Sequence, residues 1–523
     1  MSTIQPEQNK TLQAGTINFL NYFLSKGPIE KVVTDSKEAA AFTKAHIPFE
    51  AASKFRQQLG GVFTTYEQIL SIPGIDHKTI EELTHHVRKL DLRKLEALSP
   101  KTTWNNQVEA FINGPECLEL LVEEIKKAQR YIHFSVMLFF NDTSGTMVSE
   151  ALLDALSRGV QVRLMVDFGV TAIGYEKSLQ VGDFQKIADR LTSAGCKIVN
   201  TFHNCYPKDE WPQKRKELKE KGVPESTLCL QDYVQEEYLV DLNVINHRKF
   251  MVIDGKTSIV GSLNIGDQYT YDTPVQQDNP QGVPREEGEW QDGCFRIRGA
   301  AAQSLNEVFA FQWTVLGGDV YKPGDSFYQS DEDLNFGREE CTIISSFPGN
   351  PVNLIQQYYL SLISYAGDEA VIINPYLIDQ AFWDELKSLP PEQAGRITIC
   401  NPLYVNDHLT NRPAVKSNMY KPFENGVSFF DYSHTGRFSH WKISYDKRAN
   451  AVFHGSYNIN ERSACHDFEL GVLVKGKEFA SSTKNLIDGH LAVSKEIKDS
   501  SLFFKYPLLH PSTYANLVTK KFT

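Results

Sequence analysis

Residues 247–264 have the sequence His247-Arg-Lys249-Phe-Met-Val-Ile-Asp254-Gly-Lys-Thr-Ser-Ile-Val-Gly261-Ser262-Leu-Asn264. Two apolar runs flank an Asp-Gly pair, which is typical of a two-residue turn between antiparallel strands. The sequence therefore predicts a β-hairpin. Side chains two residues apart lie on one face of a strand. We expect His247 and Lys249 to point to one side, and Ser262 and Asn264 to share a face as well.

A second copy of this pattern lies further along the chain, as His440-Trp-Lys442-Ile-Ser-Tyr-Asp446-Lys-Arg-Ala-Asn-Ala-Val-Phe-His-Gly455-Ser456-Tyr-Asn458. The interval from histidine to glycine grows from 14 to 15 residues, so the second turn is longer. Only three residues separate Lys442 from Asp446, and the equivalence of Asp446 to Asp254 stays open. Two such faces, brought together, make a pocket with two ammonium groups and four further hydrogen-bonding side chains. That pocket suits an anionic tetrahedral group.

Around both hairpins, predicted strands alternate with predicted helices. A strand over 128–140, a helix over 147–157 and a strand over 159–167 precede the first hairpin. The same kinds of element recur before the second hairpin, over 352–366, 369–376, 380–389 and 396–400. Alternation predicts an α/β fold, and its recurrence predicts an internal duplication. We expect two similar α/β/α sandwich lobes, 101–335 and 336–523, related by pseudo-twofold symmetry.

Residues 1–100 form a different region, which is polar and predicted to be helical. Within it, 66–90 resembles a helix-hairpin-helix broken at Pro73-Gly74. Asp76 places a negative charge where a DNA phosphate would sit, which favours a structural or protein-contact hairpin over a DNA clamp. Two insertions interrupt the first lobe: a charged stretch over 206–240, expected to be an exposed helix or lid, and a turn-rich loop over 267–289.

Composition narrows the class of protein. The 523 residues carry 54 Lys and Arg against 65 Asp and Glu, a net charge of −11, which disfavours non-specific nucleic-acid binding. No apolar run approaches 18 residues, so a transmembrane helix is not expected. The chain shows no signal-peptide pattern at its start, and its eight cysteines lack a CxxC pair. These features favour a cytoplasmic or peripheral membrane protein, and export by a signal-less route stays open.

The two copies resemble the HxKx4Dx6GSxN motif of the phospholipase D superfamily, and the resemblance covers about 105–510. The segment Glu289-Trp290-Gln291-Asp292 and the segment 462–469 are similar to flanking elements of the cardiolipin synthase branch. The resemblance implies two displacements at phosphorus through a phosphohistidine. It also implies that no metal or other cofactor is needed, since two lysines stabilise the charge.

The resemblance also implies a role for each site residue. In that superfamily each histidine is held by an acid from the opposite half, so Glu469 would orient His247 and Asp292 would orient His440, with Asp467 as the rival to Glu469. By the same resemblance His247 is the nucleophile. The implied catalytic residues are His247, Lys249, His440, Lys442, Asn264, Asn458, Asp292 and Glu469. The expected substrate contacts are Ser262, Ser456, Tyr376 and Tyr271, with Tyr269 beside them.

Three functions are compatible with these residues. The first is a phospholipase or phosphatidyltransferase that acts on glycerophospholipids at a membrane surface, with water or an alcohol as acceptor. The second is a nuclease of the same superfamily, which segment 66–90 favours and the net charge disfavours. The third is a scaffold without activity, which the intact His and Lys positions disfavour. One chain supplies both motifs, so a monomer suffices for one site, and the oligomeric state stays open.

Some candidates are expected to be structural. His133 and His203 lie near predicted strand ends, and His454 should face away from the site. Segment 502–509, Leu-Phe-Phe-Lys-Tyr-Pro-Leu-Leu, is either a patch that dips into a membrane or a terminal segment packed in the core, and we favour the core.

Overall fold

The computed structural model describes residues 49–75 and 101–514 of the chain, and Ile17, Leu20 and Thr79 as single positions. Gaps in the second range fall at 172–183, 203–205, 207–208, 224, 238–243, 271–289, 323, 331–332, 349–352, 365 and 409. Tyr271, His203, Asp76 and most of 66–90 therefore lie outside the described residues.

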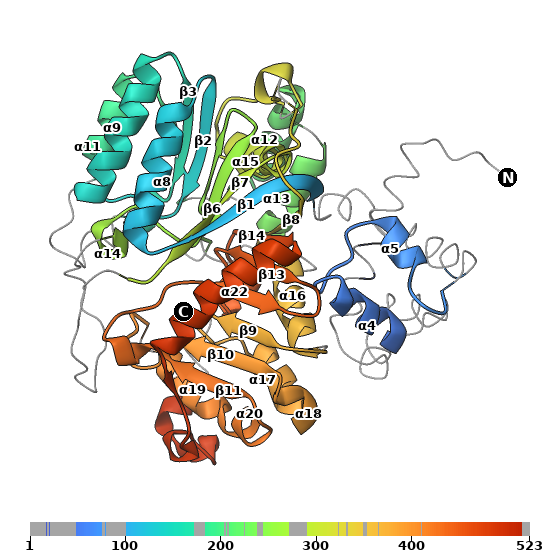
Figure 1. Ribbon diagram of the computed structural model, residues 1–523. Helices are drawn as coiled ribbons and strands as arrows, with labels where there is room; N and C mark the ends of the chain where they lie inside the picture. Colours follow the sequence, from blue (N-terminus) through green and yellow to red (C-terminus); the bar gives the residue numbers. More distant parts are fainter. Residues whose placement is uncertain are drawn as a thin grey trace.

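A single sheet of 15 strands runs through the protein (Figure 1), in the order β15-β11-β10-β9-β12-β13-β14-β8-β1-β7-β6-β5-β2-β3-β4. The first motif belongs to one half of this sheet, whose strands are β1 (Lys101–Ile112), β2 (Tyr131–Val136), β3 (Gln161–Val166), β4 (Lys197–Asn200), β5 (Phe250–Ile253), β6 (Thr257–Gly261) and β7 (Gly293–Arg298). The second motif belongs to the other half, which contains β8 (Glu339–Ser346), β9 (Ala370–Ile373), β10 (Ile397–Asn401), β11 (Ser428–Asp431), β12 (Ile443–Asp446), β13 (Ala451–Gly455), β14 (Glu469–Lys475) and β15 (Lys495–Glu496).

The two halves have matching strand orders. Outward from the junction, the first half runs β1-β7-β6-β5-β2-β3-β4 and the second runs β8-β14-β13-β12-β9-β10-β11. In both, the last three strands are parallel and the other pairs are antiparallel. The α/β class is confirmed, and the matched order agrees with an internal duplication. A symmetry axis between the halves and the division at 335/336 stay predictions, because the sheet is continuous there.

Helices cover both faces of the sheet. In the first half, α8 (Gly114–Lys127), α9 (Thr143–Ser157) and α11 (Phe184–Ser193) lie on one face of the sheet (Figure 1). Their apolar side chains form one core with the strands. In the second half, α16 (Leu354–Ser364), α17 (Gln380–Ser388), α19 (Asn411–Asn418) and α20 (Tyr420–Glu424) lie over a separate core. The helices α15 (Ala301–Val315) and α22 (Lys477–Ala492) share a third core with strands of both halves. That shared core joins the halves into one packed body.

The remaining helices are peripheral. In the charged insertion, α12 (Trp211–Glu220) and α13 (Glu225–Glu237) are joined by ion pairs of Arg215 with Asp232 and Glu225. The short helices α14 (Asp267–Thr270), α18 (Pro391–Ala394) and α21 (Glu461–Cys465) connect strands. Near the N-terminus, α4 (Phe49–Gln58) and α5 (Tyr66–Leu70) flank Val62, which packs into the core of the second half. No helix among the described residues is long and apolar enough to cross a membrane.

Both predicted hairpins are present, although the first turn is longer than expected. Ile253 pairs with Thr257, so three residues form the loop where the sequence predicted two. Asp254 and Gly255 both have positive φ, 52° and 71°, a conformation that Asp and Gly tolerate better than other residues. In the second hairpin Asp446 pairs with Ala451, which leaves a four-residue loop.

The open question about Asp446 is answered by its contacts. The Asp254 carboxylate accepts backbone hydrogen bonds from Gln129, Arg130 and Tyr131, at 2.9, 2.8 and 3.0 Å, and so holds the chain that enters β2. Asp446 makes no such contact with the start of β9. Its carboxylate accepts from the Gln57 side chain at 3.0 Å and from Ala449 N at 3.3 Å. The two aspartates are therefore not structural equivalents.

We expect Asp254→Ala to lower thermal stability more than Asp446→Ala. The first substitution leaves three backbone N–H groups without their acceptor, a loss of about 3 kcal/mol at roughly 1 kcal/mol or more each. The second removes one good hydrogen bond and one long one, about 1 kcal/mol. Differential scanning calorimetry of both variants measures the change in Tm. Equal shifts would contradict the structural distinction.

Candidate active site

The two histidine segments are each paired with a backbone segment from the opposite half of the sheet. His247 N donates to Phe468 O at 3.0 Å, and Phe468 N donates to Ile245 O at 2.8 Å. In the same way His440 N donates to Gln291 O at 2.7 Å, and Gln291 N donates to Phe438 O at 2.8 Å. Glu469 follows Phe468 and Asp292 follows Gln291 in the sequence. The crossed pairings therefore place Glu469 beside His247 and Asp292 beside His440.

The side chains repeat the crossed pairing. His247 Nδ1 lies 2.9 Å from Glu469 Oε1, and His440 Nδ1 lies 2.8 Å from Asp292 Oδ2. Both carboxylates are completely buried, and the histidines are 7% and 4% exposed. A carboxylate at Nδ1 fixes the tautomer that keeps its proton there. Within the described residues no group hydrogen-bonds Nε2 of either ring, so both Nε2 atoms are available to a substrate.

The serines of the two GSxN segments support the acids. Ser262 Oγ donates to Asp292 Oδ1, and Ser456 Oγ donates to Glu469 Oε2. Ser463 Oγ adds a hydrogen bond to Glu469 Oε1 at 2.5 Å. A hydroxyl has one proton to donate, and here the carboxylate receives it. These serines therefore position the acids that position the histidines. The expected contact of Ser262 and Ser456 with substrate stays a prediction.

Asp467, the rival to Glu469, makes a different contact. Its carboxylate pairs with Arg462 Nη2 at 2.8 Å and Nε at 3.3 Å. Between the two acids of this segment, Glu469 is the one that reaches His247.

Each lysine is anchored beside its histidine. Lys249 Nζ donates to His247 O at 2.6 Å, and Lys442 Nζ donates to His440 O at 2.7 Å. An ammonium has three protons. Among the described residues each lysine makes this one hydrogen bond, so two protons remain for an anion. Burial lowers the pKa of Lys249 to about 7 and that of Lys442 to about 8. An anionic ligand would restore both charges.

The lysine of each half changes the pKa of the histidine in the other half. Burial lowers the pKa of both histidines, and the charge of Lys442 also lowers that of His247 while the charge of Lys249 lowers that of His440. The acids differ. Burial raises the pKa of Asp292 to about 6. Burial would also raise the pKa of Glu469, but the charges of His247 and Lys249 outweigh it and hold the pKa below its ordinary value. Glu469 is the more firmly ionised partner.

The asparagines of the two motifs are not alike. Asn264 donates from Nδ2 to Tyr269 Oη at 2.8 Å and accepts from Leu138 N at 3.1 Å, so it is held in place. Asn458 Oδ1 is buried without a hydrogen-bond partner among the described residues. Of the two amides, Asn458 therefore has the free polar atom.

Aromatic rings surround His440 but not, among the described residues, His247. The ring centroids of Tyr269, Trp290 and Tyr376 lie 5.6, 5.7 and 6.4 Å from that of His440. Tyr376 therefore borders the site, as expected. Its Oη donates to Asp407 Oδ1 at 2.5 Å. Trp290 and Asp407 were missed as site residues. Trp290 stands inside the flanking segment 289–292, whereas Asp407 has no signal in its neighbouring sequence.

A further buried acid lies near Asp467 and Arg462. Asp167, at the carboxyl end of β3, is completely buried, and its Oδ2 has no partner among the described residues. Burial raises its pKa to about 7, and the charges of Asp467 and Arg462 also act on it. The signal for this residue was present, because polar residues that follow a buried parallel strand lie at the edge where α/β proteins bind ligands.

His133 and His454 are structural, as expected. His133 stacks on Phe309 with ring centroids 4.7 Å apart, and burial lowers its pKa to about 3. His454 hydrogen-bonds the carbonyls of Lys442 and Gly293 and faces away from the site. Within the described residues, no cluster of three or more His, Cys, Asp or Glu could hold a metal ion.

Comparisons with known proteins agree with this geometry. The family described as "Cardiolipin synthase, PLD-like domain" matches residues 121–274 and 359–491, which include both motifs. A cardiolipin synthase of Oceanobacillus iheyensis is 25% identical over 406 residues, covering 76% of this chain and 71% of that protein. Cardiolipin synthase 1 of Staphylococcus aureus strain MRSA252 is 24% identical over 464 residues, covering 86% of this chain and 82% of that protein.

A solved structure shares the fold. The crystal structure of phosphatidylserine synthase from Haemophilus influenzae Rd KW20 superposes with a TM-score of 0.52 at 12% sequence identity. The match covers 80% of this chain and 95% of that one. At this identity the likeness concerns the fold.

We expect Ser262→Ala to shift the pH dependence of turnover. As pH falls through about 6, Asp292 takes up a proton and His440 loses its charged partner, so kcat/KM should fall on the acid side. The Ser262 hydrogen bond lowers the pKa of Asp292, so its removal should move that fall to higher pH. It should also reduce kcat about tenfold, the equivalent of ~1.4 kcal/mol, with little change in KM.

A matched control is Ser258→Ala. Ser258 is equally buried on β6, and its hydroxyl has no partner among the described residues. Profiles of kcat/KM between pH 5 and 9 on a soluble short-chain phospholipid would distinguish the variants. A raised KM with an unchanged acid limb in Ser262→Ala would instead indicate a substrate contact.

Proposed function

Because the chain belongs to the cardiolipin synthase, PLD-like domain family, we propose that it is a phospholipase D-type phosphodiesterase and phosphatidyltransferase that acts on glycerophospholipids at a membrane surface. One observation carries this proposal: two buried histidines, each held by a carboxylate from the opposite half, lie beside two buried lysines. Two buried cations and two free Nε2 atoms suit a phosphodiester better than an uncharged substrate.

In the first displacement, His247 Nε2 attacks the phosphorus atom. His440 enters this step as the imidazolium, with a proton on each ring nitrogen. A nitrogen–phosphorus bond forms, the bond from phosphorus to the leaving alkoxide breaks, and His440 gives its Nε2 proton to that alkoxide. We assign the nucleophile to His247, the role that the resemblance to the phospholipase D superfamily implies, and the Glu469 carboxylate at its Nδ1 supports that role. A negative charge at Nδ1 increases the electron density that Nε2 offers to phosphorus.

In the second displacement, water or an alcohol enters. His440 Nε2 takes the proton from the acceptor hydroxyl, whose oxygen attacks phosphorus, and the bond to His247 breaks. Water yields phosphatidic acid and an alcohol yields a new phospholipid. Throughout, Lys249, Lys442 and the Nδ2–H group of Asn458 stabilise charge on the phosphoryl oxygens. The lysines supply the positive charge that a metal ion supplies in other phosphodiesterases.

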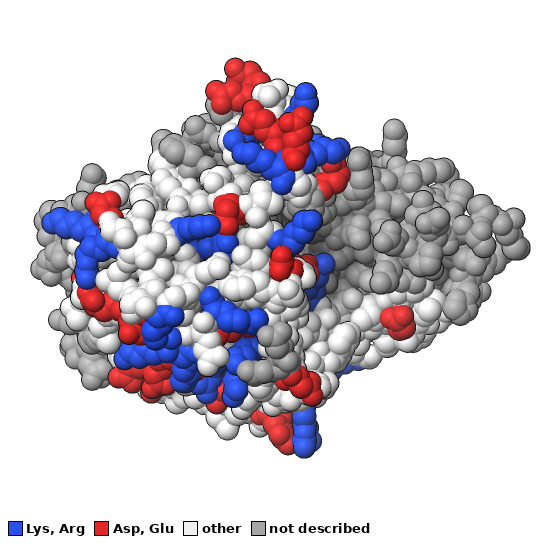
Figure 2. Space-filling view, turned by 90° about the horizontal axis from the view of Figure 1, so that it is seen from above, with Lys and Arg blue, Asp and Glu red and all other residues white. Residues whose placement is uncertain are grey.

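The nuclease alternative is less well supported. A nuclease of low sequence preference neutralises many phosphates with a continuous basic surface. Figure 2 shows Lys and Arg interspersed with Asp and Glu on the face seen from above, and the described residues of that face form no extended basic track. The net charge of −11 points the same way.

The decisive assay offers both substrates. We expect the protein, in EDTA, to release headgroup from labelled phosphatidylglycerol or phosphatidylcholine, to form a phosphatidyl-alcohol when ethanol is added, and to leave plasmid DNA intact. His247→Ala and His440→Ala should each lower the rate by about 10⁴-fold or more, since each ring takes part in both displacements. Nicked DNA with unchanged lipid would support the nuclease. Silence on both substrates would favour a scaffold without activity.

A leaving group that needs no proton separates the roles of the two histidines. With a p-nitrophenyl phosphodiester of phosphatidic acid, we expect His440→Ala to release one equivalent of p-nitrophenol in a burst and to keep the phosphatidyl group on His247. Stopped-flow absorbance and mass spectrometry of the peptide that contains residue 247 measure the two outcomes. His247→Ala should give no burst. A burst in His247→Ala with adduct on His440 would reverse the assignment.

A further inference from the structure

The most exposed apolar side chains of the described residues gather near the C-terminus. Tyr506, Leu508, Leu509 and Tyr514 are 63%, 66%, 77% and 53% exposed. We call these four residues the apolar turn. The other exposed large apolar residues, Trp104, Val320, Phe327 and Val493, are spread over the chain. Scattered apolar residues are common on soluble proteins, but a group of four calls for a partner.

The apolar turn is ordered by its own hydrogen bonds. Residues Pro507–Leu509 form the 3₁₀ turn η5, in which Leu509 N donates to Tyr506 O at 3.0 Å and His510 N donates to Pro507 O at 2.9 Å. Tyr514 Oη donates to Leu508 O at 2.8 Å. The Leu508 and Leu509 side chains are thus presented by a turn whose backbone groups are largely paired, which lowers the cost of entering an apolar medium.

The stem of the turn is fixed to the protein. Phe503 packs into the core of the second half, Phe504 N donates to Lys416 O at 2.9 Å, and Thr513 Oγ1 lies 2.9 Å from Ser417 Oγ. The sequence left two alternatives for segment 502–509, and we favoured packing in the core. The structure divides the segment: Phe503 is packed, whereas Leu508 and Leu509 face solvent.

Cations border the turn. Residues 411–424 and 502–514 together contain Arg412, Lys416, Lys421 and Lys505 and a single carboxylate, Glu424. Lys416 Nζ lies 5.1 Å from the Phe504 ring centroid, and Lys505 Nζ lies 6.0 Å from that of Tyr506. In a chain with a net charge of −11, this region is locally positive. Apolar and aromatic side chains with Lys416 and Lys505 beside them suit an anionic lipid surface.

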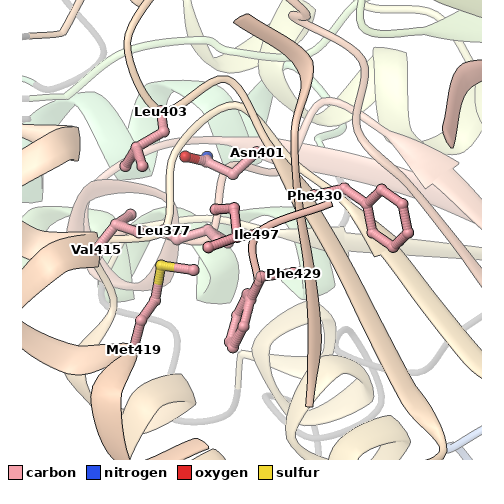
Figure 3. A pocket seen from close by; sticks show the side chains of 8 residues that line it. All are labelled: Leu377, Asn401, Leu403, Val415, Met419, Phe429, Phe430 and Ile497. Carbon is pink, nitrogen blue, oxygen red and sulfur yellow. The ribbon is translucent and has the colours of Figure 1, made fainter. Parts of the chain in front are cut away.

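The turn is also connected to the active site. Its stem contacts the carboxyl-terminal half of α19 through Phe504 and Thr513, and α19 is a helix of eight residues and hence about 12 Å long. At the other end of α19, Asn411 Oδ1 accepts from the backbone N of Leu377, the neighbour of Tyr376. Leu377, Val415 and Met419 line one apolar cavity together with Ile497, which precedes the stem in the chain (Figure 3). The stem of the apolar turn, α19 and the segment that carries Tyr376 therefore form one packed unit.

We propose that the apolar turn is a membrane-docking surface, in which Tyr506, Leu508 and Leu509 enter an anionic phospholipid bilayer while Lys421 and Lys505 meet its headgroups. The choice of partner rests on the proposed function, which places the substrate in a bilayer. If the turn docks on the bilayer, Tyr376 at the border of the active site lies about 12 Å, the length of α19, from the lipid surface.

The test compares Leu508→Ser/Leu509→Ser with Trp104→Ser, which removes an exposed aromatic side chain on β1. The wild-type chain and each variant are sedimented with vesicles of phosphatidylglycerol and phosphatidylcholine in equal parts. We expect the double variant to bind about tenfold more weakly or worse, because two apolar side chains no longer enter the bilayer. The Trp104 variant should bind like wild type. A second variant, Lys505→Glu, should lose affinity for these vesicles but not for phosphatidylcholine alone.

Turnover separates docking from chemistry. On a monomeric short-chain phosphatidylglycerol the double variant should match wild type, whereas on vesicles it should be slower. If no protein turns over the monomeric lipid but wild type still sediments with vesicles, the proposed function fails and docking stands. Wild type that stays in the supernatant, or a double variant that binds like wild type, would overturn docking. A wild-type dimer that the double variant dissociates in light scattering would also overturn it, by assigning the turn to self-association.

Discussion

Each histidine of the site is held by a carboxylate that the other half of the chain supplies, and this exchange is the constraint on which the rest of the structure depends. His247 needs Glu469, and His440 needs Asp292. The same exchange is made by the backbone through Phe468 and Gln291. Neither half can orient its own imidazole, so a half in isolation would carry a histidine with no fixed tautomer. The continuous sheet and the core shared by α15 and α22 hold the two halves in the register that this exchange requires.

The active site contains several charged side chains in a buried pocket, and their charged forms are only partly stabilised when no ligand is bound. Burial draws the pKa values of Lys249 and Lys442 down towards neutrality and that of Asp292 up. Such shifts measure how poorly the empty pocket solvates charge. A phosphodiester contributes the missing negative charge between the cations. The protein thus prepares, in the folded chain, the electrostatic environment that the transition state needs.

Chemistry and membrane contact occupy different parts of the protein. The reactive groups are buried where the two halves meet, while Leu508 and Leu509 project into solvent from a turn whose stem contacts α19. An enzyme whose substrate resides in a bilayer must both exclude water from phosphorus and meet the bilayer surface. Here the first requirement is met by packing around His440, and the second by a small surface that makes no contact with the reacting atoms.

Much of the fold and of the active site could be predicted from short stretches of the sequence. Strand periodicity and the two HxK…GSxN copies were enough to predict the α/β class, both hairpins and the four His and Lys residues of the site, because these depend on neighbours within a few positions. Folding settled what local pattern could not: the continuity of the sheet, the attachment of Ser262 and Ser456 to the acids, the aromatic wall beside His440, and the exposure of Leu508. Those features depend on which strands become neighbours across long separations in the chain, and side-chain periodicity along one strand does not record its partner on another.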